Sequence, residues 1–353
     1  MFFSAKSKGF FVEQNAHVTL LARTSTVAVP LVVEEVRECA TGDHEALAKA
    51  IKELQPKKSP SGYLQGICGV YPAKRLVRRA TLELKRIKDP AYFPEIITQQ
   101  FRLEADKYAT VVLNANDGSD FDPNRPAPQK EVLFGGMPSD EVVAVQNALL
   151  EQGIYPERLE IGSIATLGAL ADYLSFTGDK TPALVLEIGA DSTHSYIVSS
   201  SGVEASRPIP QGYEAMVPVV QKELGLKDEE SARKLFLSNT FDFTGMGPIL
   251  TRRLIKELQS SIGFYEVQTG QSVGLLHCTQ LPEKLAWLGG AVATALGVGP
   301  VKLDLPAWLE SRKITLAENV QPAVNDRWLG LFSLMVDHNA SNPAPDAVAE
   351  KKD

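Results

Sequence analysis

Residues 182–200, PALVLEIGADSTHSYIVSS, hold the side chains of this chain best suited to phosphate chemistry. The polar residues of this segment surround a predicted turn between two strands: Glu187, Gly189, Asp191, Ser192 and Thr193. Amides of such a turn can donate to a phosphate, and the two hydroxyl groups can add donors. Tight turns also select Gly, Asp and Ser for steric reasons alone. The segment therefore predicts either a phosphate cradle or an ordinary hairpin.

The spacing of the cysteine and histidine residues does not indicate a metal site or a reactive thiol. The three cysteines, Cys39, Cys68 and Cys278, lack the C-x-x-C spacing of zinc or redox sites, so we expect buried free thiols. No second metal-type residue stands at a suitable distance from His194 or His277. We therefore predict no metal site, and we assign no catalytic role to Glu187 or Asp191.

Two further motifs have ordinary structural explanations. The segment LFGGMP at 133–138 lacks the G-K-S/T ending of a phosphate loop, so we interpret it as a structural turn. Arg252, Arg253 and Lys256 fall on a predicted helix next to Glu257. This pattern favours a solvated helix face with an ion pair one turn away.

Length and composition exclude several classes of protein. A chain of 353 residues is long enough for two or three core-forming units, and its net charge of -7 gives no general attraction to nucleic acid or acidic lipid. The start of the chain lacks the apolar core of a signal peptide, and no apolar run is long enough to span a membrane. We expect a cytoplasmic protein that binds no nucleic acid and does not insert into the membrane.

The order of predicted elements gives an α/β chain with two similar halves. Strands are predicted over 9–33, a helix over 42–55 with Asp43 as N-cap, and a βαβα unit over 131–174. The second half begins again with the hairpin at Gly189 and continues into helices, including a long one over 247–270. The polar end of the chain is predicted to be disordered.

This order resembles the PilM family of type IV pilus assembly proteins, relatives of the cell-division protein FtsA. The similar segments include LVLEIGADSTHSYIV, SRPIPQGYEAM, ESARKLF and LIKELQSSIGFYEVQ, and the resemblance extends over about the whole chain. It implies a two-lobed actin-like (ribonuclease H-like, duplicated) α/β fold. The implied boundaries are 1–75 and 138–178 for the first lobe body, 76–137 for a subdomain inserted in it, 179–335 for the second lobe and 336–353 for a disordered tail.

The sequence departs from actin-like ATPases at three places where nucleotide would bind. The Asp-x-Gly turn near the N-terminus is replaced by FFVEQNAHV, with Val12 or Glu13 for the aspartate and no glycine. Glu187 replaces the second aspartate, and its extra methylene would shift a bound ligand. The Gly-Gly turn that accepts adenosine is replaced by HCTQLPEK, while Gly289 and Gly290 come later and are interpreted as a helix packing contact.

The resemblance therefore implies a cytoplasmic scaffold without ATPase activity. It would bind the cytoplasmic tail of an inner-membrane PilN-like protein, in a groove between the first lobe and its insert, and lie peripheral to that membrane through this partner. Residues Glu187 to Thr193 would retain at most weak binding of ATP with Mg²⁺. A working actin-like ATPase and an FtsA-like filament-forming protein remain the alternatives, and homo-oligomerisation stays open.

Overall fold

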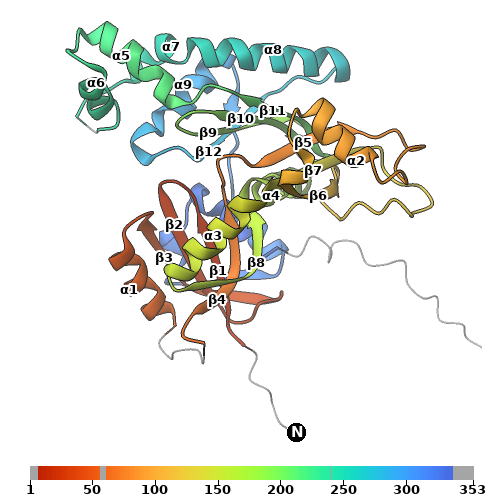
Figure 1. Cartoon of the computed structure of the whole chain (residues 1–353). Coiled ribbons are helices and arrows are strands. Elements are labelled where there is room, and N and C mark those ends of the chain that lie inside the picture. The colour runs from red at the N-terminus through yellow and green to blue at the C-terminus, as the bar shows by residue number, and fades with distance from the viewer. Residues whose placement is uncertain (1–6, 56–60, 239, 337–353) are drawn as a thin grey trace, which may run out of the picture.

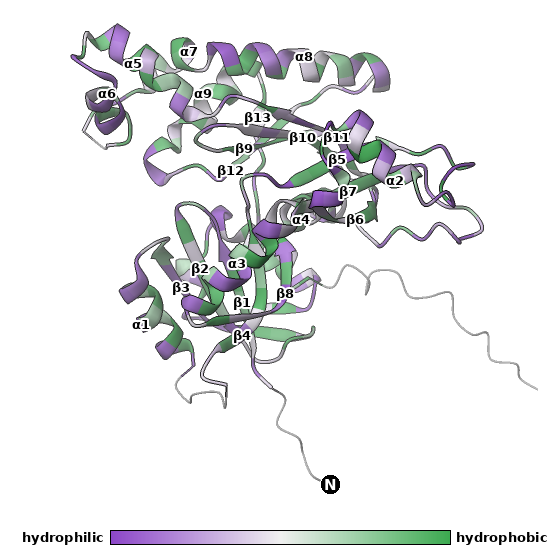
Figure 2. Cartoon of the chain, viewed as in Figure 1, coloured by the Kyte–Doolittle hydropathy of each residue, from purple (hydrophilic) through white to green (hydrophobic). Residues whose placement is uncertain are grey.

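The computed structural model describes residues 7–55, 61–238 and 240–336. Figure 1 shows two lobes, one built around the first strands of the chain and one around β9 to β12, with a smaller sheet beside the second lobe. Hydrophobic residues concentrate on the strands of the sheets, whereas hydrophilic ones dominate outer elements such as α6 (Figure 2). Of the predicted tail at 336–353, residues 337–353 lie outside the described residues, whereas Val336 is buried.

The first lobe contains a six-stranded mixed sheet in the order β14-β3-β2-β1-β4-β8. β1 pairs antiparallel with β2 and parallel with β4, so the hairpin predicted over 9–33 starts the sheet. The bounds are β1 Gly9–Gln14, β2 Val18–Thr24, β3 Leu31–Ala40, β4 Leu64–Val70, β8 Ile154–Ile161 and β14 Ile314–Leu316.

Helices cover both faces of this sheet because side chains alternate along each strand. On one face, Val12 and Leu21 pack with Leu47 and Leu54 of α1 (His44–Leu54), and the Asp43 carboxylate caps α1 as predicted. α3 (Ser139–Glu151) belongs to the same face, and no side chain caps its start. On the other face, Phe11 packs with α4 (Gly162–Thr177).

The C-terminal segment returns to the first lobe, which differs from the expected second-lobe boundary at 335. Ile314–Leu316 pairs in parallel with β3 at Leu31–Val33, and α11 (Leu329–Ser333) packs on α4 and β1. Buried Trp308 and Trp328 belong to the same core as Phe11. The reason is hydrophobic burial, since this segment covers a face of the first sheet that would otherwise meet water. α10 (Leu305–Ser311) lies between β13 and β14, and the Asp304 carboxylate caps its start.

A separate three-stranded antiparallel sheet, in the order β5-β7-β6, forms the insert. Its elements are β5 Leu76–Thr81, α2 Tyr92–Glu95 with a π-helical turn Ile96–Gln100, β6 Tyr108–Asn114 and β7 Glu131–Pro138. Gly135 and Gly136 lie inside β7 and not in the predicted turn. A Cβ at Gly136 would lie 2.5 Å from the Ala109 carbonyl oxygen, so the close approach of β6 requires glycine there.

The second lobe contains a five-stranded sheet in the order β11-β10-β9-β12-β13. Helices α8 and α9 contact β11 and β12 respectively, while α4 contacts β10 and β11. The strands are β9 Ala183–Ile188, β10 Thr193–Ser199, β11 Gly202–Ile209, β12 Leu275–Thr279 and β13 Gly299–Pro300. The helices are α5 Val217–Leu224, α6 Glu229–Phe236, α7 Gly247–Leu250, α8 Arg252–Thr269 and α9 Trp287–Leu296.

The insert is attached to the second lobe as well as to the first. Its strand β5 lies beside β11 (Figure 1), and the Arg79 amide donates to the Ser206 hydroxyl at 2.7 Å. The Val203 amide donates to the Ala115 carbonyl at 2.9 Å. A Cβ at Gly202, where φ is +108°, would lie 2.1 Å from that same oxygen. The segments around Arg79 and Ala115 are therefore both bonded to β11, where the insert meets the second lobe.

Candidate functional site

The turn between β1 and β2 is closed by an asparagine side chain. Asn15 Oδ1 accepts from the His17 amide at 2.8 Å and from the Val18 amide at 2.9 Å, and the Asn15 amide donates to the Val18 carbonyl at 3.0 Å. An Asx turn of this kind needs no glycine. It also occupies the amides that a phosphate cradle would have to offer, so this turn is not built to hold phosphate.

The turn between β9 and β10 has a different hydrogen-bonding state. The Gly189 amide donates to the Ser192 carbonyl at 2.9 Å, and the amides of Tyr213 and Glu214 donate to the carbonyls of Gly189 and Ala190. By contrast, the amides of Ala190, Asp191 and Ser192 donate to no group within the described part of the chain. Three amides at one turn remain available to an anion.

The five residues singled out from sequence are divided between two environments. Gly189, Asp191 and Ser192 form the turn, with Asp191 exposed. Thr193 is buried, and its hydroxyl donates to the Gln211 carbonyl at 2.8 Å. Glu187 is 2% exposed and lies inside the molecule. Only the turn residues are placed to meet a ligand from solvent.

Glu187 belongs to a buried polar cluster that joins the two lobes. Arg75 Nη2 donates to Glu187 Oε2 at 2.5 Å, and Arg75 Nε donates to the Ser163 hydroxyl at 2.8 Å. Ser163 in turn donates to Glu187 Oε2 at 2.9 Å. His194 Nδ1 lies 3.2 Å from Arg75 Nη2, and burial followed by the charges of Arg75 and Arg78 lowers the pKa of His194 to about 3. His194 is therefore neutral and accepts from the guanidinium.

Glu13, which with Val12 was one of the two candidates for the first aspartate position of actin-like ATPases, is also buried. The Tyr71 hydroxyl donates to Glu13 Oε1 at 2.8 Å and lies 3.1 Å from the Thr166 hydroxyl. The Leu331 amide approaches the carboxyl, but Oε2 has no hydrogen-bond partner in the described structure. Burial raises the pKa of Glu13 to about 7, against the lowering effect of the Tyr71 bond. A Cβ at Gly330 would lie 2.4 Å from Oε1, so α11 closes over this acid.

A third departure is visible after β12. Gln280 has a φ of +65°, a left-handed conformation that glycine adopts more easily than other residues. The backbone shape of a glycine turn is thus present where the sequence has no glycine. Gly289 faces Cys278, because a Cβ there would lie 3.5 Å from Cys278 Sγ, whereas a Cβ at Gly290 would meet no atom within 4 Å. Of the two glycines, only Gly289 makes the predicted packing contact.

The turn between β1 and β2 and the turn between β9 and β10 approach each other through an aromatic pair. The His17 ring lies 6.4 Å from the ring of Tyr213, so the lobes touch where the turns face each other. The acids do not fit a metal here, because Glu187 is paired with Arg75 and Glu13 is buried against Tyr71. No group of three or more His, Cys, Asp or Glu side chains suited to a metal occurs among the described residues. The buried pair of Arg75 and Glu187 thus links the segment after β4 to β9 of the second lobe.

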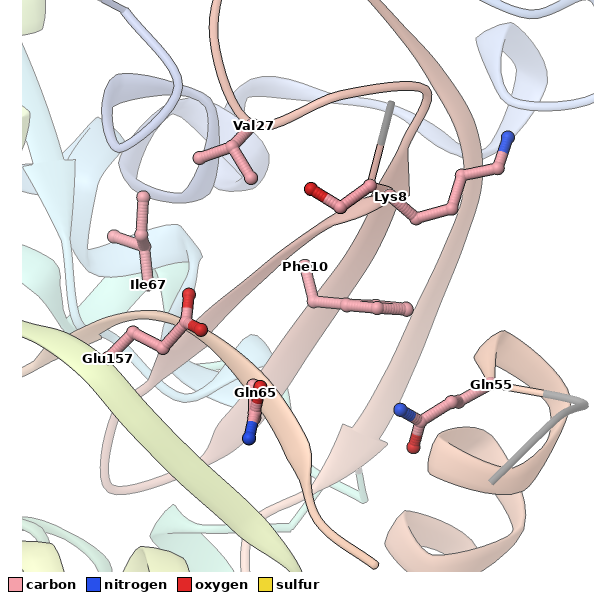
Figure 3. A pocket seen from close by; sticks show the side chains of 8 residues that line it. Lys8, Phe10, Val27, Gln55, Gln65, Ile67 and Glu157 are labelled. Carbon is pink, nitrogen blue, oxygen red and sulfur yellow. The ribbon is translucent and has the colours of Figure 1, made fainter. Parts of the chain in front are cut away.

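A separate pocket of about 340 Å³ opens at the opposite end of β1 (Figure 3). Phe10, Gln65, Ile67 and Glu157 line it together with Ser7, Lys8, Val27 and Gln55. Its lining combines one carboxylate and two amides with aliphatic and aromatic walls, while the Lys8 ammonium is paired with Glu34. None of the residues identified from sequence lies there, and the site between the lobes does not include it.

Sequence reasoning missed Arg75 and Tyr71. A usable signal existed, because β1 and β4 are parallel neighbours with Gln14 beside Val70. Residues that follow parallel strands meet at one edge of the sheet, so the segment YPAKR after β4 had to lie near Glu13. Without knowing which strands pair, this adjacency could not be recognised.

No family model matches this sequence, and no curated protein matches it either. Among solved structures, the fold is similar to a chain of a PilM-PilN type IV pilus biogenesis complex, with a TM-score of 0.65. That match has 17% sequence identity and covers 94% of this chain and 98% of the other. The chain has an actin-like, PilM-like fold.

Weaker matches have the same general architecture. One is a protein of unknown function with an actin-like ATPase fold from Bacteroides thetaiotaomicron, with 11% identity, a TM-score of 0.45, and coverage of 95% of this chain and 97% of that one. Another is an archaeal actin homologue, with 10% identity, a TM-score of 0.42, and coverage of 95% and 100%. The predicted two-lobed actin-like fold class is confirmed by the match to the PilM-PilN chain at a TM-score of 0.65. In the described parts of this PilM-like fold, no helix is both long and apolar enough to cross a bilayer.

Proposed function

We propose that this chain is a scaffold of a type IV pilus or related secretion complex that binds the cytoplasmic tail of an inner-membrane PilN-like protein and does not hydrolyse ATP. The observation that carries the proposal is the similarity of almost the whole chain to a protein of a PilM-PilN complex. The internal pairing of Glu187 with Arg75 and the asparagine-closed first turn support the absence of hydrolysis. The alternative of a working ATPase would need these acids to face a metal.

The insert offers an unpaired strand edge for an extended peptide. β6 is the outer strand of the insert sheet. The Asn114 amide and the Val112 carbonyl point outward, since they bond to Ser119 and Phe121 at 2.8 and 3.0 Å. Backbone groups alternate in direction along an antiparallel strand, so both polar groups of Thr110 also point outward. They have no strand partner among the described residues. A peptide could therefore add to β6 at Thr110.

Exposed apolar side chains lie near this edge. Val111 on β6 is 52% exposed and Val143 on α3 is 54% exposed, and α3 contacts β6. The edge thus adjoins the first lobe body, which agrees with a groove between that body and the insert. Main-chain hydrogen bonds would give affinity there, and pockets for alternate side chains would give selectivity.

Thr110→Pro tests the proposal sharply. Proline removes the outward amide and is tolerated on edge strands, whereas Thr110→Ala keeps the amide and serves as the matched control. The probe is a labelled peptide of the cytoplasmic segment of the PilN-like protein from the same organism, measured by fluorescence anisotropy. We expect at least about 10-fold weaker binding for Thr110→Pro and unchanged binding for Thr110→Ala. Equal binding by both variants would refute the edge as the site.

A titration with Mg-ATP addresses the nucleotide separately. The free amides of Ala190 to Ser192 support weak phosphate binding at the second turn. We expect weak or no heat of binding by calorimetry and no phosphate release above background. Removal of 76–137 is a poorer test of the peptide site, because it would also strip Ser206 and Val203 of their partners in the insert.

A further inference from the structure

Helix α8 exposes a face whose composition is unlike that of the rest of the surface. An α-helix turns about 100° per residue, so the residues opposite its buried side fall within one arc of about 120°. They are Arg252, Arg253, Lys256, Ser260, Gly263, Phe264 and Val267. The buried side consists of Leu254, Ile255, Leu258 and Tyr265. Figure 1 shows α8 along the outer surface of the second lobe.

The two halves of this face differ in chemistry. The N-terminal half carries Arg252, Arg253 and Lys256, all exposed and without an ion pair among the described residues. The C-terminal half carries Phe264, 66% exposed, and Val267, 88% exposed. These are the two most exposed large hydrophobic side chains in the described structure. A Cβ at Gly263 would meet no atom within 4 Å, which confirms that no other element covers this half.

No acid compensates the cations on this face. The helix has two acids, and both are engaged away from the outward arc. Glu257 pairs with Arg207 at 2.6 Å, and Glu266 Oε1 accepts from the Val273 amide at 3.0 Å. The chain as a whole has a net charge of -7, so this concentration of positive charge is local. The net charge of the whole chain predicted no attraction to acidic lipid, but the positive charges of α8 are concentrated on one face and can attract such lipid locally.

We propose that α8 docks on the surface of an anionic bilayer, with its axis in the plane of the membrane. The three cations would meet lipid phosphates, while Phe264 and Val267 would enter the boundary between headgroups and acyl chains. Charge complementarity selects this occupant. A two-fold contact with a second copy would place the basic half of each helix against the apolar half of the other, and six cations would have no counterion. An acidic protein surface would pair with the cations, but it would not account for the exposed apolar side chain of Val267.

This contact lies on the second lobe, whereas the peptide edge lies on the insert of the first lobe. The proposed membrane contact therefore does not depend on a PilN-like partner. It is peripheral, and it adds a direct lipid contact to a protein otherwise expected to reach the membrane only through its partner.

Vesicle co-sedimentation of the full chain, with no other protein present, tests the proposal. We expect binding to vesicles of phosphatidylcholine with phosphatidylglycerol and little binding to phosphatidylcholine alone. Replacing the three cations with glutamate (R252E/R253E/K256E) should reduce the partition coefficient by about 100-fold or more. The matched control K49E/K52E/K180E changes the net charge equally at exposed lysines elsewhere and should retain most of the binding.

The apolar half has its own variants. Phe264→Ser with Val267→Ser should weaken binding by about 10-fold, whereas Val111→Ser with Val143→Ser should not. An environment-sensitive fluorophore on Phe264→Cys should shift to shorter wavelength only with anionic vesicles. Equal binding to neutral vesicles, no binding to either kind, or α8 variants that match their controls would each overturn the proposal. So would a lipid-free dimer that Phe264→Ser disrupts, because a second copy would then cover α8.

Discussion

The buried acid Glu13 gives the clearest prediction for stability. Burial raises the pKa of Glu13 to about 7 in the folded state, from an ordinary value of 4.5 for a glutamate in water. The folded chain therefore binds this proton more tightly than the unfolded chain, and stability falls as pH rises between these two values. Working the linkage between pH 5 and pH 8 gives a loss of about 2 to 3 kcal/mol from this group alone.

Glu13→Gln should remove that dependence, because glutamine cannot ionise. Its carbonyl can still accept from Tyr71, as the protonated acid does. Urea unfolding at pH 5 and pH 8 gives the difference in unfolding free energy between variant and wild type at each pH. We expect this difference to favour the variant by about 2 to 3 kcal/mol more at pH 8 than at pH 5.

Comparing the two pH values cancels any constant cost of the amide, such as an unsatisfied N–H. The exposed acid Glu45 provides a control, since Glu45→Gln should leave the pH profile close to that of wild type. Parallel profiles for Glu13→Gln and wild type would show that Glu13 is ionised in the folded state, and the assignment of a neutral buried acid would then be incorrect.

Three further predictions concern the links between the lobes. Arg75→Ala should lower the unfolding free energy by about 3 to 5 kcal/mol, because it leaves Glu187 charged and unpaired; adding Glu187→Gln should recover part of this in the same urea assay. Gly202→Ala should cost about 2 kcal/mol in thermal unfolding, since its Cβ would overlap the Ala115 carbonyl oxygen, whereas Gly178→Ala meets no atom and isolates the cost of a positive φ. Steady-state incubation with Mg-ATP should release no phosphate above background; release that is lost in Glu187→Ala would contradict the pairing of Glu187 with Arg75 as the resting state.

The arrangement of the first lobe was predictable where local signals were strong. The alternation over 9–33 and the Asp43 cap led to strands and a helix that the structure confirms. Gly135 and Gly136 were misassigned to a turn, because glycine in a strand and glycine in a turn look the same in sequence. What distinguishes them is the close approach of β6, which is a tertiary fact.

The candidate site was predicted only in part. The hairpin at Gly189 and its sequence position were correct, yet the chemistry of Glu187 depends on Arg75, which is 112 positions away in sequence. No periodicity or local motif reports a contact of that range. Similarly, Gln280 has a φ of +65°, a conformation that a glycine in the sequence would have indicated. A glutamine at this position gives no such indication.

The return of the C-terminal segment to the first lobe has a consequence for biosynthesis. Strands β9 to β13 are contiguous between Ala183 and Pro300, so the second-lobe sheet can form as soon as that stretch leaves the ribosome. The first-lobe sheet begins at Gly9 but lacks β14 and the covering helix α11 until Ser333 is synthesised. The part of its apolar face that α4 does not cover therefore stays exposed to chaperones and to aggregation until β14 and α11 have been synthesised. The lobe that is made first is the one completed last.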